Sequence, residues 1–92
     1  MAVKYSAHAE QKLSMRRIRK EEVERLIVRS KQRYDDIEHD AKVAVGPVNG
    51  RFLVVTYRMV NADIKVITVY HARKLEKLIL SKTKRGAWRE TQ

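Results

Sequence analysis

The sequence contains no cysteine, so it can form neither a disulfide bond nor a thiolate metal site. It contains no apolar run close to the roughly 18 residues that a membrane-spanning helix needs. Its first six residues, MAVKYS, include no apolar stretch of signal-peptide length. These absences exclude disulfide-rich secreted proteins and proteins embedded in a membrane. We expect a soluble, cytoplasmic protein that makes no contact with a membrane.

Proline and glycine are also scarce. The single proline and the three glycines all lie after residue 45, and no repeat or low-complexity linker interrupts the 92 residues. A chain of this length can cover a sheet with two or three helices but is too short for a second core. We therefore predict one domain over residues 1–92, with a basic tail from about residue 82.

Acidic residues are few compared with basic ones. The chain has 11 aspartates and glutamates against 21 lysines and arginines, a formal net charge of +10. Residues 42–92 contain 11 basic and 3 acidic side chains, whereas residues 1–41 contain 10 and 8. Such an excess attracts phosphates, so the expected partner is a nucleic acid, RNA before DNA. The alternatives are a surface that only keeps the protein soluble and a thermophile-like composition rich in ion pairs. Ion-pair networks need matched acids, which the second half lacks.

The pattern of apolar residues predicts an α+β fold. Ser6 is placed to cap a first helix, and Asn49-Gly50 predicts a tight turn between two strands, since both residues tolerate positive φ. The predicted order is strand 3–5, helices 7–15 and 20–30, strands 43–48, 51–60 and 64–70, and a last helix marked by Leu75, Leu78 and Ile79. We expect two N-terminal helices packed on a three- to four-stranded antiparallel sheet, followed by a C-terminal helix.

One face of the first predicted helix carries a line of basic side chains. His8, Lys12 and Arg16 are four residues apart, the spacing at which side chains lie one above the other on a helix. This stripe is suited to following the phosphates of a nucleic acid. The alternative is an ordinary solvated helix face.

The last two predicted strands offer a second group of residues. With a tight turn near residue 61, strand alternation places Arg58 and Lys65 on one face with His71 and Arg73, opposite the core. An imidazole titrates near neutral pH and can move a proton, and a guanidinium can hold a phosphate through two hydrogen bonds. His71 and Arg73 are thus candidates for a phosphodiester site. The alternative for His71 is a hydrogen-bonded surface residue.

The basic tail combines cations with one indole, which suits attraction of a nucleic-acid backbone and stacking on a base. Its members are Lys82, Lys84, Arg85, Trp88 and Arg89. We expect the tail to assist RNA binding and to be dispensable for folding, or else to be disordered. His39 lies in an acidic stretch, residues 35–40, whose spacing fits no metal-ligand pattern. We predict a solvated turn there, and no metal or other cofactor.

Several of these residues match a known pattern. His8-Ala9, Lys12, Arg16, Ile18 and Val23 resemble the H-A-x-x-R-x-x-x-R-x-I-x-x-x-x-V opening of the domain-of-unknown-function family 4258, and residues 66–70 resemble its closing strand. That family looks like a branch of the RelE/ParE toxin superfamily. Residues 71–76 are similar to the strand-to-helix junction of BrnT, another member. The chain departs from the family pattern at three positions: Lys12 stands for arginine, Arg17 for glycine, and Arg19 for serine or threonine.

The resemblance implies a RelE-like fold and a metal-independent endoribonuclease toxin that acts on free or ribosome-bound mRNA and is paired with an acidic antitoxin protein. In such a mechanism the ribose 2′-hydroxyl attacks the adjacent phosphate. For this reaction we expect a base or acid at His71, charge stabilisation at Arg58, Arg73 and Arg85, and assistance from Tyr57 or Tyr70. Two alternatives remain open: a nucleic-acid-binding or regulatory module without chemistry, and an inhibitor of a protein such as gyrase, which some superfamily members poison.

Overall fold

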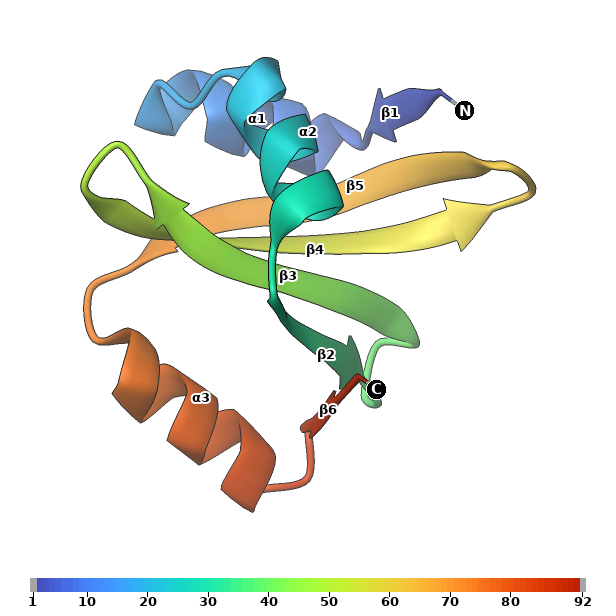
Figure 1. Ribbon diagram of the computed structural model, residues 1–92. Coiled ribbons are helices and arrows are strands. Elements are labelled where there is room, and N and C mark those ends of the chain that lie inside the picture. The colour runs from blue at the N-terminus through green and yellow to red at the C-terminus, as the bar shows by residue number, and fades with distance from the viewer. Residues whose placement is uncertain (1, 92) are drawn as a thin grey trace.

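The computed structural model describes residues 2–91, and over these residues the chain has an α+β fold with three helices and six strands (Figure 1). In chain order the elements are β1 (Val3–Tyr5), α1 (Ala7–Arg16), α2 (Lys20–Arg29), β2 (Gln32–Asp36), β3 (Ala41–Val48), β4 (Arg51–Val60), β5 (Asp63–Ala72), α3 (Leu75–Lys84) and β6 (Trp88–Glu90). No helix in this part of the chain is long and apolar enough to cross a membrane.

All six strands join one mixed sheet in the order β1-β5-β4-β3-β2-β6. β1 runs parallel to β5, and the other neighbours are antiparallel. The prediction of a three- to four-stranded antiparallel sheet is therefore wrong. It omits β2, whose sequence QRYDD has one apolar residue, Tyr34, and resembles a polar turn. It also omits β6, which lies in the predicted tail, and it does not foresee that β1 pairs in parallel.

Local signals in the sequence explain the parts of the fold that were predicted correctly. The Ser6 hydroxyl accepts a hydrogen bond from the backbone N–H of Ala9 at 3.0 Å and so caps α1. Asn49 and Gly50 have φ angles of 51° and 79°, so both adopt the left-handed backbone that the turn between β3 and β4 requires. These two features fix the start of α1 and the position of the β3–β4 turn.

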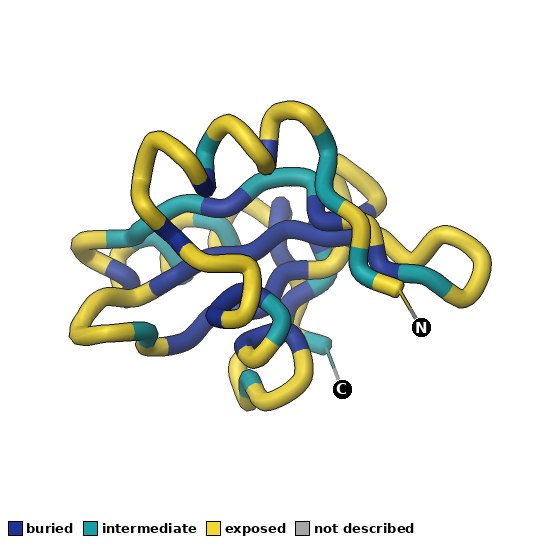
Figure 2. The backbone as a smooth tube through the Cα atoms, turned by 90° about the horizontal axis from the view of Figure 1, so that it is seen from above, coloured by how far each residue is buried: buried dark blue, intermediate teal, exposed yellow. Residues whose placement is uncertain are grey.

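Helices cover both faces of the sheet: α1 and α2 lie on one face and α3 on the other (Figure 1). In Figure 2 the buried backbone runs through the middle of the molecule, with exposed turns around it. One apolar cluster lies under α1 and α2 and includes Leu13, Val23, Leu53 and Val66. A second lies on the α3 side and includes Val43, Val54, Leu75 and Trp88. The chain thus has two apolar clusters, one on each face, where the sequence predicted a single core.

A bulge in β5 decides which face each of its later side chains occupies. Thr56 pairs with Thr68 and Tyr57 pairs with Val66, so Ile67 is an extra residue without an opposite partner. Before the bulge, Ile64 and Val66 face α1 and α2; after it, Val69 does. The predicted face assignment is therefore correct up to residue 66 and reversed beyond it. His71 lies on the face covered by α1 and α2, where it pairs with Leu53, and it does not share a face with Arg58.

The predicted basic tail is part of the fold. Trp88 is only 3% exposed, and its ring stacks on Tyr34 with 5.3 Å between centroids. β6 pairs with β2, with Trp88 opposite Asp36. A ring buried in this way has no face open to a base, so the expectation that Trp88 stacks on RNA does not fit its position. The end of the chain is ordered through β6 and closes the α3 side of the sheet.

Because Trp88 packs in the second cluster, we expect Trp88→Ala to lower the free energy of unfolding by roughly 3 to 5 kcal/mol. Removal of residues 84–92 should be at least as damaging, because it also deletes the β6 edge. Denaturant unfolding measures both effects.

Leu80→Ala is the matched control. Leu80 lies on α3 but is 65% exposed, so its truncation should change stability by no more than about 0.5 kcal/mol. A truncated protein as stable as the full chain would contradict the assignment of Trp88 to the core.

Candidate nucleic-acid interface

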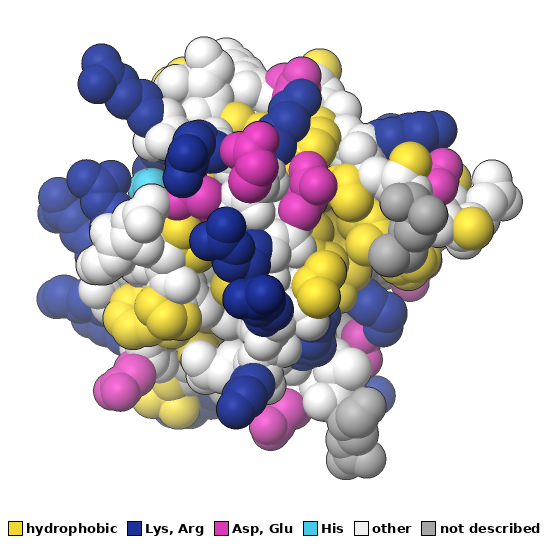
Figure 3. All heavy atoms as spheres, turned by 45° about the horizontal axis from the view of Figure 1, so that its top comes forward, with side chains coloured by type: hydrophobic (Ala, Val, Ile, Leu, Met, Phe, Trp, Pro, Cys, Tyr) yellow, Lys and Arg dark blue, Asp and Glu magenta, His cyan; other side chains and the backbone are white. Residues whose placement is uncertain are grey.

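A basic pocket opens at one end of the sheet, where α1 ends, β4 begins after the β3–β4 turn, and β5 ends. Its cavity has a volume of about 840 Å³, and five lining residues define what is here termed the His71 pocket: Arg16, Arg17, Arg51, His71 and Arg73. A smaller adjoining cavity of about 340 Å³ shares the first four of these and adds Glu22 and Asn49. In Figure 3, basic side chains gather around an imidazole on the left of the molecule, the side on which Figure 1 shows the β3–β4 turn.

The arginines of the His71 pocket have no acidic partners. None of the four forms an ion pair with a carboxylate among residues 2–91. Arginines elsewhere are engaged: Arg19 pairs with Glu22, and Arg85 pairs with Glu38. Four guanidinium groups without an ion pair outweigh the one carboxylate of the adjoining cavity, Glu22, and so attract an anion. Guanidinium geometry favours the two oxygens of a phosphate.

Arg17 is held in the pocket by an unusual backbone conformation. It caps the C-terminus of α1 with φ 54° and ψ 45°, the left-handed region that glycine adopts most easily. The Ile18 N–H donates to the carbonyl of Leu13 at 3.0 Å and so closes the last turn. A non-glycine residue in this conformation costs about 1 kcal/mol. The strained residue is thus the one that places a second guanidinium in the pocket, beside that of Arg16.

Glu22 links the start of α2 to the β3–β4 turn beside the pocket. Its side chain is buried, and its carboxylate accepts hydrogen bonds from the backbone N–H of Arg19 at 3.0 Å and from the amide of Asn49. The first bond is the half of a capping box that the third helical residue supplies, and it satisfies the N–H of Arg19 at the start of α2. The second holds the β3–β4 turn against α2. Because Arg51 directly follows that turn, Glu22 also positions Arg51.

His71 is the one proton-transfer group of the predicted set that lies in this pocket. The bulge at Ile67 turns its imidazole toward the arginines, and its Nδ1 atom is buried with no hydrogen-bond partner in the described part of the chain. Burial, and then the positive charges of Arg51 and Arg16, hold the pKa of His71 below its ordinary value of 6.5. The imidazole is therefore neutral at pH 7 and can accept a proton.

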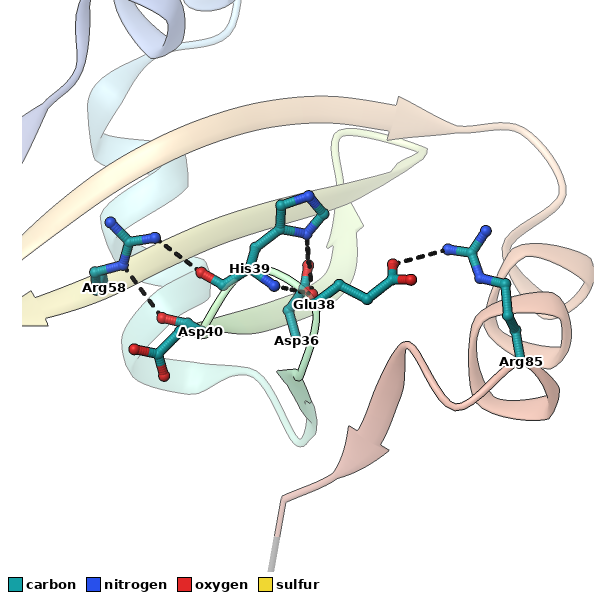
Figure 4. A network of polar contacts seen from close by, with 6 residues as sticks. All are labelled: Asp36, Glu38, His39, Asp40, Arg58 and Arg85. Atoms are coloured by element: carbon teal, nitrogen blue, oxygen red, sulfur yellow. Dashed lines mark hydrogen bonds and ion pairs between the residues drawn. The ribbon is translucent and has the colours of Figure 1, made fainter.

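Arg58 and Lys65 lie far from the His71 pocket. Arg58 on β4 pairs with Lys65 on β5. Lys65 comes six residues before His71, a separation of roughly 20 Å along the strand. The Arg58 guanidinium donates to the backbone carbonyls of His39 at 2.8 Å and Asp40 at 3.2 Å (Figure 4). Arg58 thus holds the β2–β3 turn in place, and it cannot act together with His71 on one phosphate.

Neither predicted tyrosine lies in the His71 pocket. Tyr57 is 5% exposed on the α2 side, where its hydroxyl accepts a hydrogen bond from Arg33 at 3.0 Å. Tyr70 lies on the α3 side, against the cluster that contains Trp88, and burial raises its pKa. The structure therefore separates both tyrosines from His71.

The remaining predicted nucleic-acid contacts lie on two surfaces. On α1, His8 is exposed and Lys12 is half-buried, and Arg16 is the member of that stripe that lines the pocket. The tail residues lie on α3 and β6: Lys84 and Arg89 are exposed, Arg85 pairs with Glu38 at 3.2 Å, and the Lys82 ammonium lies 5.9 Å from the centre of the Trp88 ring. The tail therefore forms a basic surface separate from the His71 pocket.

The acidic turn between β2 and β3 gathers Asp36, Glu38 and His39, with one ligand atom of each within 4.8 Å of the others. These groups already have protein partners. The His39 Nδ1 lies 3.0 Å from the Asp36 carboxylate, and Glu38 pairs with Arg85 (Figure 4). Their interactions fasten the β2–β3 turn to α3.

Comparison with known families identifies the chain. The model described as "Domain of unknown function (DUF4258)" matches residues 5–71. The chain belongs to the DUF4258 family. The resemblance to family 4258 is thereby confirmed, whereas the relation to the RelE/ParE superfamily and to BrnT stays a prediction. The DUF4258 match spans every residue of the His71 pocket except Arg73. No curated protein and no solved structure matches the chain significantly.

The low pKa of His71 can be measured by an NMR titration of the imidazole. We expect a value below 6.5 in the unaltered protein, and a higher value in Arg51→Gln, because loss of a nearby positive charge makes protonation easier. Since folding lowers this pKa, the stability of the protein should fall as the pH decreases from 6.5 toward the pKa of the folded state.

Arg89→Gln on β6 serves as the control, because it removes the same charge far from His71. If Arg51→Gln and Arg89→Gln shift the titration equally, the effect is one of net charge, and the assigned local effect of the Arg51 charge on the pKa of His71 is wrong.

Proposed function

We propose that the His71 pocket of this DUF4258 protein binds the sugar-phosphate backbone of RNA. There the protein cleaves the RNA as a metal-independent endoribonuclease of the RelE/ParE toxin type. One observation carries the proposal: four guanidinium groups, none of them in an ion pair among residues 2–91, surround an imidazole whose pKa is lowered. Guanidinium groups bind the phosphate, and a neutral imidazole supplies a base. We infer a cytoplasmic protein with mRNA, free or ribosome-bound, as its substrate.

In the proposed reaction the scissile phosphate lies among Arg16, Arg51 and Arg73. The Nε2 lone pair of His71 takes the proton of the ribose 2′-hydroxyl, since Nδ1 is buried, and the 2′-oxygen forms a bond to phosphorus. The bond from phosphorus to the 5′-oxygen breaks, and that oxygen takes a proton from water. The arginines stabilise the extra negative charge on the phosphate oxygens in the transition state. The products are a 2′,3′-cyclic phosphate and a 5′-hydroxyl end.

This reaction explains the preference for RNA over DNA, because deoxyribose has no 2′-hydroxyl to attack the phosphate. The net charge of +10 further favours an acidic protein as the neutralising partner of such a toxin.

A second candidate function is nucleic-acid binding without cleavage. The observation that favours it is the position of Tyr57, Tyr70 and Arg58, which leave His71 without the predicted catalytic partners. The same pocket would then hold an RNA phosphate and carry out no proton transfer.

Cleavage separates the two candidates. We expect the protein to cut single-stranded RNA in the presence of a chelator, and His71→Ala to slow cutting by about 10²- to 10⁴-fold, the usual contribution of a proton-transfer group. RNA affinity should change far less, because the lost imidazole is neutral. Labelled RNA separated by electrophoresis gives the rate, and analysis of the ends detects the cyclic phosphate.

His8→Ala is the matched comparison, since it removes an exposed imidazole from α1 without altering the pocket. An unaltered protein that shifts RNA in a gel but leaves it uncut supports the second candidate. A protein that cuts RNA and whose His71→Ala variant cuts equally fast would refute the role of His71.

Arg17→Gly should separate stability from binding. Glycine adopts the left-handed conformation without strain, so we expect a free energy of unfolding that is unchanged or up to about 1 kcal/mol higher. RNA affinity should fall by roughly tenfold, the equivalent of about 1.5 kcal/mol for one charged hydrogen bond. Denaturant unfolding and an equilibrium binding titration measure the two effects.

Arg17→Ala is the control, because it removes the charge and keeps the backbone strain. It should lose the same affinity without the gain in stability. Affinity that is unaffected in both variants would place Arg17 outside the RNA contact.

A further inference from the structure

A further cavity lies beside the His71 pocket, at the junction of β5 and α3. Its volume is about 530 Å³. Part of its wall is apolar, formed by Phe52, Leu75 and Ile79. The charged part consists of three cations, Arg73, Lys74 and Lys77, and one carboxylate, Glu76. It is here termed the Phe52 cavity.

The two cavities are neighbours, because Phe52 and Arg73 line both. Phe52 is the second residue of β4 and pairs with Ala72, so its ring lies on the α3 side while its neighbour Arg51 lines the His71 pocket. The residue is 42% exposed. An aromatic ring thus stands at the border of the basic pocket with much of its surface open to solvent.

We propose that the Phe52 cavity binds one unpaired base of an RNA strand whose phosphate lies in the His71 pocket. This assignment rests on the proposed function and names its substrate more closely, as single-stranded RNA or an unpaired loop. Phe52 stacks on the base, and the apolar side chains of Leu75 and Ile79 complete the wall. A base in a duplex is covered by its neighbours in the stack and cannot enter such a cavity.

The charges around the cavity support a nucleotide as its occupant. Lys74 and Lys77 form no ion pair with a carboxylate of residues 2–91, and with Arg73 they outnumber the one carboxylate of the wall, Glu76. A nucleotide has the matching character, since its flat base stacks on an aromatic ring while its phosphate contacts cations. With one phosphate in the His71 pocket and one base against Phe52, the strand runs from the end of α1 toward the start of α3.

The test uses a short single-stranded RNA with 2′-O-methyl ribose, which keeps its backbone but cannot be cut. A series of such oligonucleotides, each lacking the base at one position, is bound to the unaltered protein and to Phe52→Ala. Loss of one particular base should weaken binding to the unaltered protein by roughly 5- to 100-fold, as expected when one stacked base is lost. Phe52→Ala should bind the complete oligonucleotide equally weakly and should no longer distinguish the abasic one.

Phe52→Tyr keeps the ring and should restore the affinity. Met59→Ala is the matched control, because Met59 lies on the same strand with a similar exposure of 46% but at the opposite end. It should bind as the unaltered protein does. The abasic series on the unaltered protein gives a result even if Phe52→Ala folds poorly.

If the abasic oligonucleotides all bind equally well to the unaltered protein while Arg51→Ala weakens binding, the Phe52 cavity holds no base and the proposed function stands. If the unaltered protein binds none of these RNAs, both proposals are wrong.

Discussion

The pairing of β4 with β5 is the constraint on which the rest of the structure depends. These are the two longest strands, and the extra residue at Ile67 exchanges the faces of every later side chain in β5. Val69 therefore joins the apolar cluster under α1, Tyr70 joins the cluster under α3, and His71 turns toward the end of α1. Without the bulge, His71 would point to the α3 side and Tyr70 into the pocket.

The His71 pocket is assembled at some cost in stability. Its four guanidinium groups repel one another and have no acidic partner among the described residues, and Arg17 lies in a strained backbone conformation. Glu22 offsets part of this cost by joining α2 to the β3–β4 turn. Backbone strain and like charges that are concentrated in one place are typical of functional sites. The placement of strain and charge at the same end of the sheet is thus consistent with selection for anion binding.

Much of the fold could be predicted from local signals in the sequence. The cap at Ser6, the Asn49-Gly50 turn and the three-strand meander follow from chemistry within a few residues. The bulge could not be predicted, because residues 66–70 are apolar at almost every position and lack the alternation that would assign them to a face. β2 and β6 could not be predicted either, since each is short, polar and stabilised by pairing with a distant segment.

The same limit applies to the candidate site. Residue type was enough to identify three residues of the candidate site, His71, Arg73 and Arg16. Arg58, Tyr57 and Tyr70 were included because they lie close to these residues in the sequence or on the neighbouring strand, and the structure places them elsewhere. Arg17 and Arg51 could not be recognised, because their place in the pocket depends on the end of α1 and on the register of β4 with β5. The complete site could have been predicted only if the pairing of β4 with β5 had been known.

The most direct test of the central claim, that the His71 pocket holds RNA phosphate, is the salt dependence of RNA affinity. The logarithm of the binding constant should fall linearly with the logarithm of the salt concentration, and each phosphate contact contributes about 0.7 to the slope for single-stranded RNA. The double variant Arg51→Ala, Arg73→Ala should reduce the slope by about 1.4, the contribution of two such contacts. A slope that is unchanged in that variant but reduced in Lys82→Ala, Lys84→Ala would contradict the account and place the phosphate contacts on α3.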